Sequence, residues 1–187
     1  MRYLFFLIVI SVVMSAFENA DAQGLQNEIK IQRPDFSGKW SIDVAKSRFS
    51  SKKGPVEKNL VWIVTISQRS QNIIIKMDTK SDRVASESWE YTLQPDGRPK
   101  KFGSGFLIAK WTDKKLIVQF FDAPNEIMFE QYRELVSELH FELLPDGNTL
   151  QIVSKFAEGR WGYNSNPRPN VIDEQYSEYL IFSRVKN

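Results

Sequence analysis

Residues 35–43 read DFSGKWSID, and residues 44–49 continue with VAKSRF. Gly38 stands two residues before Trp40, at the start of the first of many segments that alternate as β-strands do. The stretch follows shortly after a leader-like N-terminus, so it predicts where the folded part of the chain begins. It indicates an architecture and not a chemistry, because no group of residues in the sequence identifies a reaction or a named ligand.

The body of the chain is a succession of predicted strands, and no window of about 11 residues keeps apolar residues at helical spacing. Two turns, Pro95-Asp96-Gly97 and Pro145-Asp146-Gly147, place Gly where a positive φ is needed, and Thr112–Lys115 predicts a short polar hairpin connection. Short links favour an antiparallel up-and-down arrangement. The expected strands are residues 36–43, 60–67, 72–79, 87–94, 105–112, 115–122, 131–144, 149–156 and 177–185.

Alternation gives each expected strand one apolar face. In the strand expected at residues 131–144, Leu139 and Phe141 alternate with Glu138, His140 and Glu142. By the same count the inward residues of the other strands are Trp62, Val64, Ile66, Ile73, Ile75, Met77, Trp89, Tyr91, Leu93, Leu116, Val118, Phe120, Leu150, Ile152, Phe156, Leu180 and Phe182. One-sided strands close into a barrel or form two packed sheets. Closure removes exposed edges, so we expect an all-β, up-and-down barrel of about 8–10 strands.

The N-terminus predicts an export signal at residues 1–22. Arg2 precedes an apolar run at residues 3–14, and Ala20 and Ala22 supply small residues where a signal peptidase cleaves. The run is shorter than the roughly 20 residues that cross a bilayer, so no stable membrane anchor is expected after cleavage. We therefore expect a flexible N-terminal segment at residues 23–34 and a single barrel domain at 35–187, in an exported protein that is periplasmic or secreted.

Composition excludes several classes of protein. Removing residues 1–22 takes Arg2 from 25 basic residues, and Glu18 and Asp21 from 23 acidic ones, which leaves a net charge of +3. Basic residues are scattered among acidic ones, so no nucleic-acid partner is expected. The chain has no Cys and a single His, His140, whereas structural zinc takes four ligands. No metal or cofactor is expected, and the sequence carries no signal about the oligomeric state.

Two further motifs occur later in the chain beside the opening motif of residues 35–49. Together with LPDGNTL at residues 144–150 and YLIFSR at residues 179–184, it resembles an exported bacterial lipocalin-like β-barrel family of unassigned function, over nearly the whole chain from Asp35. The resemblance implies that Gly38, Trp40 and Arg184 close one end of the barrel. It also implies a cation–π contact between Arg184 and Trp40, in a structural role and not in cargo binding.

The chain departs from the family pattern at residues 157–175, a long connection without strand alternation. Long loops in compact domains are functional or disordered. Trp161 and Tyr163 lie beside Gly and Arg in this loop. They are expected either to border a ligand-binding mouth or to pack over an end of the barrel.

Two functions from different classes stay open. The first is an exported, non-enzymatic barrel that binds a small apolar or amphipathic molecule. Its candidate lining is Trp62, Met77, Trp89, Tyr91, Phe120 and Phe141, with Trp161 and Tyr163 at the mouth. The second is a filled barrel that serves as a cell-envelope structural or protein-interaction module, because side chains alone fill a barrel of about eight strands.

Room for a ligand needs small inward residues, and only Gly105, Ala109 and Ser137 supply them. A third hypothesis is a hydrolase that uses paired carboxylates, with Glu87 and Asp122 as candidates. Paired carboxylates are the remaining acid/base option, because the sequence offers no partners for nucleophilic catalysis by Ser or Cys. No recognisable catalytic constellation supports this hypothesis.

Overall fold

The computed structural model describes residues 32–50, 56, 59–82, 85–157 and 172–186. The chain divides into two units, Met1–Gln32 and Arg33–Asn187, and the fold is that of the second unit. The predicted signal peptide and the loop residues Trp161 and Tyr163 lie outside the described residues.

Strands make up most of the described part of the second unit, and one short helix interrupts them. In chain order the elements are β1 (Gly38–Ile42), β2 (Val61–Gln68), β3 (Ile73–Lys80), β4 (Glu87–Leu93), β5 (Asp96–Phe102), β6 (Gly105–Thr112), β7 (Lys115–Asp122), α2 (Glu126–Tyr132), β8 (Glu134–Leu143), β9 (Thr149–Ala157) and β10 (Ile172–Arg184).

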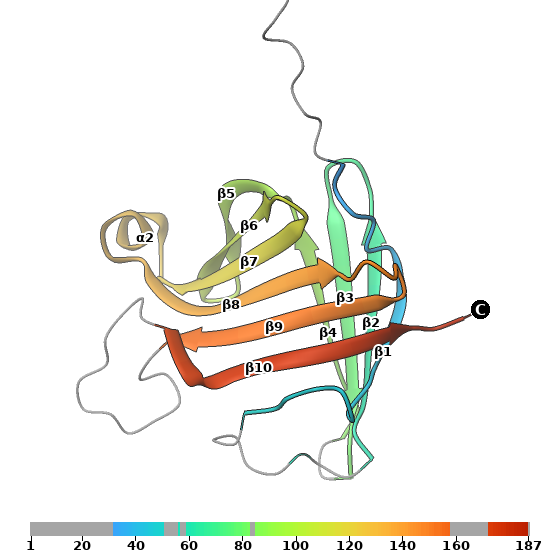
Figure 1. Ribbon diagram of the computed structural model, residues 1–187. Helices are drawn as coiled ribbons and strands as arrows, with labels where there is room; N and C mark the ends of the chain where they lie inside the picture. Colours follow the sequence, from blue (N-terminus) through green and yellow to red (C-terminus); the bar gives the residue numbers. More distant parts are fainter. Residues whose placement is uncertain (1–31, 51–55, 57–58, 83–84, 158–171, 187) are drawn as a thin grey trace, which may run out of the picture. The chain divides into compact units, whose positions relative to one another are not determined.

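The strands form one 10-stranded sheet with the order β4-β3-β2-β1-β10-β9-β8-β7-β6-β5. All neighbours are antiparallel, and all but one pair are consecutive in the chain. The exception is β1 with β10, where Trp40 lies opposite Arg184. Figure 1 shows β1–β4 running across the direction of β8–β10, so the sheet is strongly curled. The expected all-β, antiparallel up-and-down barrel of about 8–10 strands is confirmed.

The two edges of the sheet, β4 and β5, meet through side chains. No backbone ladder joins these two strands, both of which are described in full. The ring centroids of Tyr91 and Phe102 are 5.3 Å apart. Phe120 on β7 lies 6.0 Å from Tyr91 and 5.8 Å from Phe102. Aromatic contacts therefore connect the edges on the inner side of the curled sheet.

An up-and-down sheet places alternate connections at opposite ends. The β2–β3, β4–β5, β6–β7 and β8–β9 connections share one end, which we call the Trp111 end after the residue near the end of β6. The remaining connections share the other end, which we call the Phe102 end after the last residue of β5. The turns expected at Gly97 and Gly147 have the positive φ that was predicted, 76° and 66°.

The expectation missed β5 because this strand is polar. It carries four charged residues and Pro99, with a register shift between Asp96 and Pro99. Proline has no N–H for a ladder, which suits an edge strand. Only Phe102, on its inner face, joins the aromatic contacts.

The strand expected to begin at residue 131 begins at Glu134, because the preceding residues form α2. Asn125 caps this helix by accepting a hydrogen bond from the Met128 backbone N–H at 2.9 Å. Phe129 is buried on the outer side of the sheet, 4.8 Å from Phe106 and 5.4 Å from Phe121. The last strand also begins earlier than expected, at Ile172, with a register shift between Asp173 and Glu178.

The core fills the half of the barrel toward the Trp111 end. Phe36, Trp40, Leu116, Leu150 and Phe182 are 0% exposed. The other buried members of this cluster, which share the inward faces assigned by alternation, are Val64, Ile66, Ile73, Ile75, Met77, Leu93, Leu107, Ala109, Val118, Phe141, Ile152 and Leu180.

Two of the three small inward residues, Gly105 and Ala109, do not open space for a ligand as expected. Ala109 is 0% exposed within the core. A Cβ on Gly105 would collide with the carbonyl oxygen of Phe121 on the neighbouring strand. Gly105 therefore permits the close approach of β6 and β7 beside the irregularity between Phe120 and Phe121, and the expectation for it is wrong.

We expect Trp40→Ala to lower the free energy of unfolding by about 3–5 kcal/mol, because it empties a completely buried indole site. Trp89→Ala is the matched control, since Trp89 is 43% exposed and its removal should cost less than about 1 kcal/mol. Denaturant melts of the two variants measure both values. Equal losses would contradict a special role for Trp40.

Candidate functional site

Trp40 and Arg184 close the Trp111 end of the barrel. The Arg184 guanidinium carbon lies 4.1 Å from the centre of the Trp40 ring, so the cation–π contact implied by the family resemblance is present. Nη1 of Arg184 donates to the Ser37 carbonyl at 2.8 Å, and Nε1 of Trp40 donates to the Phe36 carbonyl at 3.0 Å. Both donors are thus directed at backbone carbonyls and not at a ligand.

The packing of Arg184 on Trp40 also requires a glycine at position 38. Its φ is 140°, a value that side chains rarely allow, and a Cβ there would lie 2.7 Å from Nη1 of Arg184. The guanidinium therefore packs directly on the Gly38 backbone. This geometry explains why a glycine precedes Trp40 by two residues.

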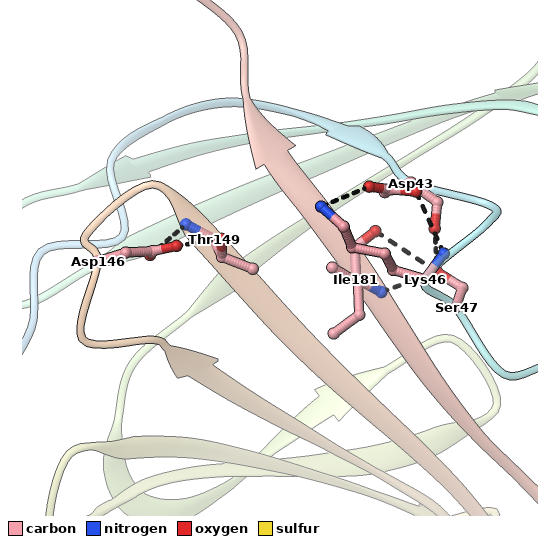
Figure 2. A network of polar contacts seen from close by, with 6 residues as sticks. All are labelled: Asp43, Lys46, Ser47, Asp146, Thr149 and Ile181. Carbon is pink, nitrogen blue, oxygen red and sulfur yellow. Dashed lines mark hydrogen bonds and ion pairs between the residues drawn. The ribbon is translucent and has the colours of Figure 1, made fainter.

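Two carboxylates in connections, Asp43 after β1 and Asp146 between β8 and β9, have structural roles (Figure 2). Asp43 pairs with Lys46 at 3.1 Å, and Ser47 donates its hydroxyl to the Asp43 carbonyl at 2.8 Å. The Ile181 backbone N–H donates to Oγ of Ser47 at 2.9 Å, which ties the turn after β1 to β10. In the β8–β9 hairpin, Asp146 accepts the Thr149 hydroxyl at 2.6 Å.

The inner wall changes character toward the sheet edges β4 and β5. Inward side chains near Trp40 are fully buried, whereas Trp62, Tyr91 and Phe120 are only half-buried. On the edge strands themselves, Phe102 is 38% exposed and Trp89 is 43% exposed. The inner wall beside these edges therefore presents aromatic surface that the described residues leave partly uncovered.

Tyr91, Phe102 and Phe120 form the centre of this surface, and we call them the aromatic cluster. Burial raises the pKa of the Tyr91 hydroxyl, so this group stays protonated and can donate a hydrogen bond at neutral pH. Phe102 was missed because β5 was missed. Its position directly before the Gly103-Ser104-Gly105 turn is the signal that could have placed it at a strand end.

Trp62 contributes a buried polar group to the inner wall. Its ring packs edge-on against Phe182, with centroids 5.8 Å apart. Nε1 of Trp62 is buried and has no hydrogen-bond partner among the described residues. A buried donor without a partner is a group that a bound molecule can satisfy.

Two charged residues also belong to the inner face. Glu178 shares the face of Leu180 on β10, is 8% exposed and lies opposite Ser154. Its Oε1 accepts a long hydrogen bond of 3.5 Å from the Ser50 backbone N–H. Lys100 lies two residues before Phe102 on β5, so its side chain leaves the strand on the same face. Alternation within β10 could have found Glu178, but Lys100 depended on β5.

The remaining predicted lining residues lie apart from this surface or within the core. Met77 is 6% exposed and Phe141 is 1% exposed, so both are packed within the core. Glu87 and Asp122, the candidates for hydrolysis, are exposed residues at strand ends on β4 and β7.

His140 and Glu138 form a pair on the outer face. Nε2 of His140 lies 2.8 Å from Oε2 of Glu138, and this hydrogen bond holds the pKa of Glu138 below its usual value. Within the described ranges, no group of three His, Asp or Glu side chains could hold a metal ion. Nor does any helix in those ranges have the length and apolarity to span a membrane.

Comparison with known proteins finds no matching family model and no matching curated protein. Among solved structures, the chain is similar to a REP1-NXSQ fatty acid transporter, with 11% identity and a TM-score of 0.47 over 82% of this chain and 98% of that one. A tyrosine-to-phenylalanine mutant of that transporter gives 12% identity and a TM-score of 0.42, over 80% of this chain and 97% of that one.

The hydrogen bonds that the Asp146 carboxylate accepts in the β8–β9 hairpin should make the stability of the protein depend on pH in the acid range. The Thr149 hydroxyl, and then the Asn148 backbone N–H, lower the pKa of Asp146. A carboxyl whose folded pKa is lowered stabilises the protein above its unfolded pKa, about 3.9, and loses this effect as pH falls through the folded value. Asp146→Asn should therefore be less stable than wild type at pH 7.

The difference between Asp146→Asn and wild type should shrink as the pH falls below the unfolded pKa of about 3.9, and disappear once the wild-type carboxyl is protonated in the folded protein as well. Unfolding free energies measured across this range test the expectation. Thr149→Val removes the hydroxyl donor and no charge. Like Asp146→Asn, it should reduce the pH dependence of the free energy of unfolding. A difference that stays constant with pH would contradict the assigned cause.

Proposed function

We propose that this protein is an exported, non-enzymatic barrel of the lipocalin-like family that binds a small apolar or amphipathic molecule beside the sheet edges β4 and β5. The observation that carries the proposal is the contrast between the middle of the inner wall and its two edges. Inward residues near Trp40 are 0% exposed, while Phe102 and Trp89 keep about two fifths of their surface exposed.

The contrast favours a shallow site over a barrel filled throughout. A filled barrel would bury its inward aromatic residues at both ends, because burial of an aromatic side chain stabilises by about 1.5–3 kcal/mol. Here the aromatic cluster lies on an inner, concave face beside an unpaired edge. A bound apolar molecule would supply the missing burial.

The polar groups of the inner face support an amphipathic ligand. Lys100, the Tyr91 hydroxyl and Nε1 of Trp62 can all donate hydrogen bonds, and Glu178 can accept them. Such sparse polar groups among aromatic ones fix the orientation of a ligand in pockets of this kind.

A cell-envelope interaction module is the second candidate. Ile127 on α2 is 69% exposed and Met128 is 38% exposed. Two adjacent apolar side chains on a short outer helix are a small patch, well under the several hundred Å² that usually mark an interface. The aromatic cluster joins three rings on the inner, concave face of the sheet, so binding of a small molecule is the preferred function.

Phe102→Ala should weaken binding of a neutral apolar dye, N-phenyl-1-naphthylamine, by about tenfold, which corresponds to about 1.4 kcal/mol. Dye fluorescence measures the affinity, and thermal melts establish that the variant is folded. Ile127→Ala is the matched control, because it removes a more exposed apolar side chain from the outer surface. Equal affinities of Phe102→Ala and wild type would overturn the proposed site.

The natural cargo and the export signal can be tested together. Native mass spectrometry of the protein purified from the exported fraction should give the mass of residues 23–187 with one small molecule bound, which solvent extraction would identify. A clean ligand-free mass, without a thermal shift in a panel of lipids, haem and sterols, would favour the interaction module. Protein that keeps residues 1–22 would contradict cleavage.

A further inference from the structure

A polar cleft lies at the Trp111 end, beside the β2–β3 and β4–β5 connections. A hollow of about 520 Å³ opens between the β2–β3 hairpin, represented by Ser70 and Gln71, and the β4–β5 connection, represented by Gln94. Arg33 and Arg98 also line it. A volume of this size is within the range of small-molecule sites, about 300–1,000 Å³.

A second hollow of about 260 Å³ adjoins the first, since Arg33 and Ser70 line both. It adds Arg69 and the half-buried Trp111 to the walls. We call the two hollows together the arginine cleft. Three guanidinium groups, from Arg33, Arg69 and Arg98, thus border one continuous depression.

Positive charge exceeds negative charge in the arginine cleft. Its lining includes the carboxylates of Asp35 and Asp96 beside the three arginines, so three positive and two negative groups leave a formal charge of +1. Asp35 accepts the Ser37 N–H at 2.9 Å, and Asp96 accepts the Arg98 N–H at 3.0 Å. No ion pair joins the three guanidinium groups to a carboxylate within the residues that the structure describes.

Packing beneath the cleft holds Arg33 in place. Its guanidinium carbon lies 5.6 Å from the centre of the Trp111 ring, and the ring stacks on Phe36 with an interplanar angle of 16°. Gln68 fixes the adjoining backbone by donating to the Pro34 carbonyl at 3.1 Å and accepting the Phe36 N–H at 3.2 Å. Arg33 is thus set on a rigid aromatic platform.

We propose that the arginine cleft binds a small hydrophilic molecule that bears a phosphate group. Guanidinium groups match phosphate oxygens with two parallel hydrogen bonds, which a scattered surface lysine does not do. The hydroxyl of Ser70 and the amides of Gln71 and Gln94 can bond to the hydroxyl groups of the same molecule. This site is independent of the apolar site proposed above.

The test uses the protein of residues 23–187 with three probes: inorganic phosphate, glucose 6-phosphate and glucose. Binding is followed by Trp fluorescence, since Trp111 lies in the cleft wall, and by calorimetry. Glucose 6-phosphate should bind more tightly than inorganic phosphate, and glucose should not bind. No saturable binding of either phosphate compound, or equal binding of glucose, would overturn the proposal.

Arg98→Gln should weaken binding of glucose 6-phosphate by about tenfold. Lys80→Gln is the matched control, because it removes one positive charge at the opposite end of the sheet. Equal losses in the two variants would mean general attraction by net charge and would overturn the site. Vesicles containing phosphatidic acid, compared with phosphatidylcholine vesicles, distinguish a lipid headgroup from a free sugar phosphate as the source of the phosphate.

The dye experiment on Phe102→Ala is a separate control. Arg98→Gln should leave binding of the apolar dye unchanged, because Arg98 and the aromatic cluster are separated by most of the length of β5. Failure of one site is thereby distinguishable from failure of the other.

Discussion

The contact between Trp40 and Arg184 joins the first strand of the sheet to the last, and the barrel depends on it. Ser37 and Arg184 are 147 residues apart in sequence, yet a hydrogen bond of 2.8 Å connects them. Closing so long a loop costs conformational entropy. A completely buried indole, a cation over its face and a glycine beneath the guanidinium offset that cost at one point. The contact lies on the β1–β10 ladder, which makes one sheet of β1–β4 and β5–β10.

Tight connections at the Trp111 end help to pack the core. At this end the chain turns sharply, with Asp113 at a φ of 52° between β6 and β7, and with the hydrogen bond from Thr149 to Asp146 between β8 and β9. Tight turns bring the inward residues of neighbouring strands, such as Leu116 and Leu150, into one layer. The edge strands β4 and β5 have a paired neighbour on one side only, so the inward aromatic residues on them are less completely covered.

Sequence alternation predicted the faces of the strands well, because a residue such as Ile75 or Val118 is buried on one side of a sheet whatever its neighbours are. It could not find β5, whose polar residues and Pro99 are tolerated only because the strand is an edge. Nor could it find α2, a seven-residue helix in which Phe129 is the one buried side chain among residues 126–131. The aromatic cluster was predicted only in part for the same reason: Tyr91 and Phe120 follow from alternation, and Phe102 does not.

The unpaired edges place the opening of the barrel beside the aromatic cluster. An exposed edge usually invites pairing with another chain, and Pro99 with the charged residues of β5 disfavours this. Between β4 and β5 the inner wall is held by ring contacts among Tyr91, Phe102 and Phe120, each of about 0.5–1.5 kcal/mol. A strand pair joined by a full ladder would have to break several backbone hydrogen bonds to separate. The β4–β5 edge is therefore the part of the wall that separates at the lowest cost, and a ligand that replaces the ring contacts with its own apolar surface recovers that cost.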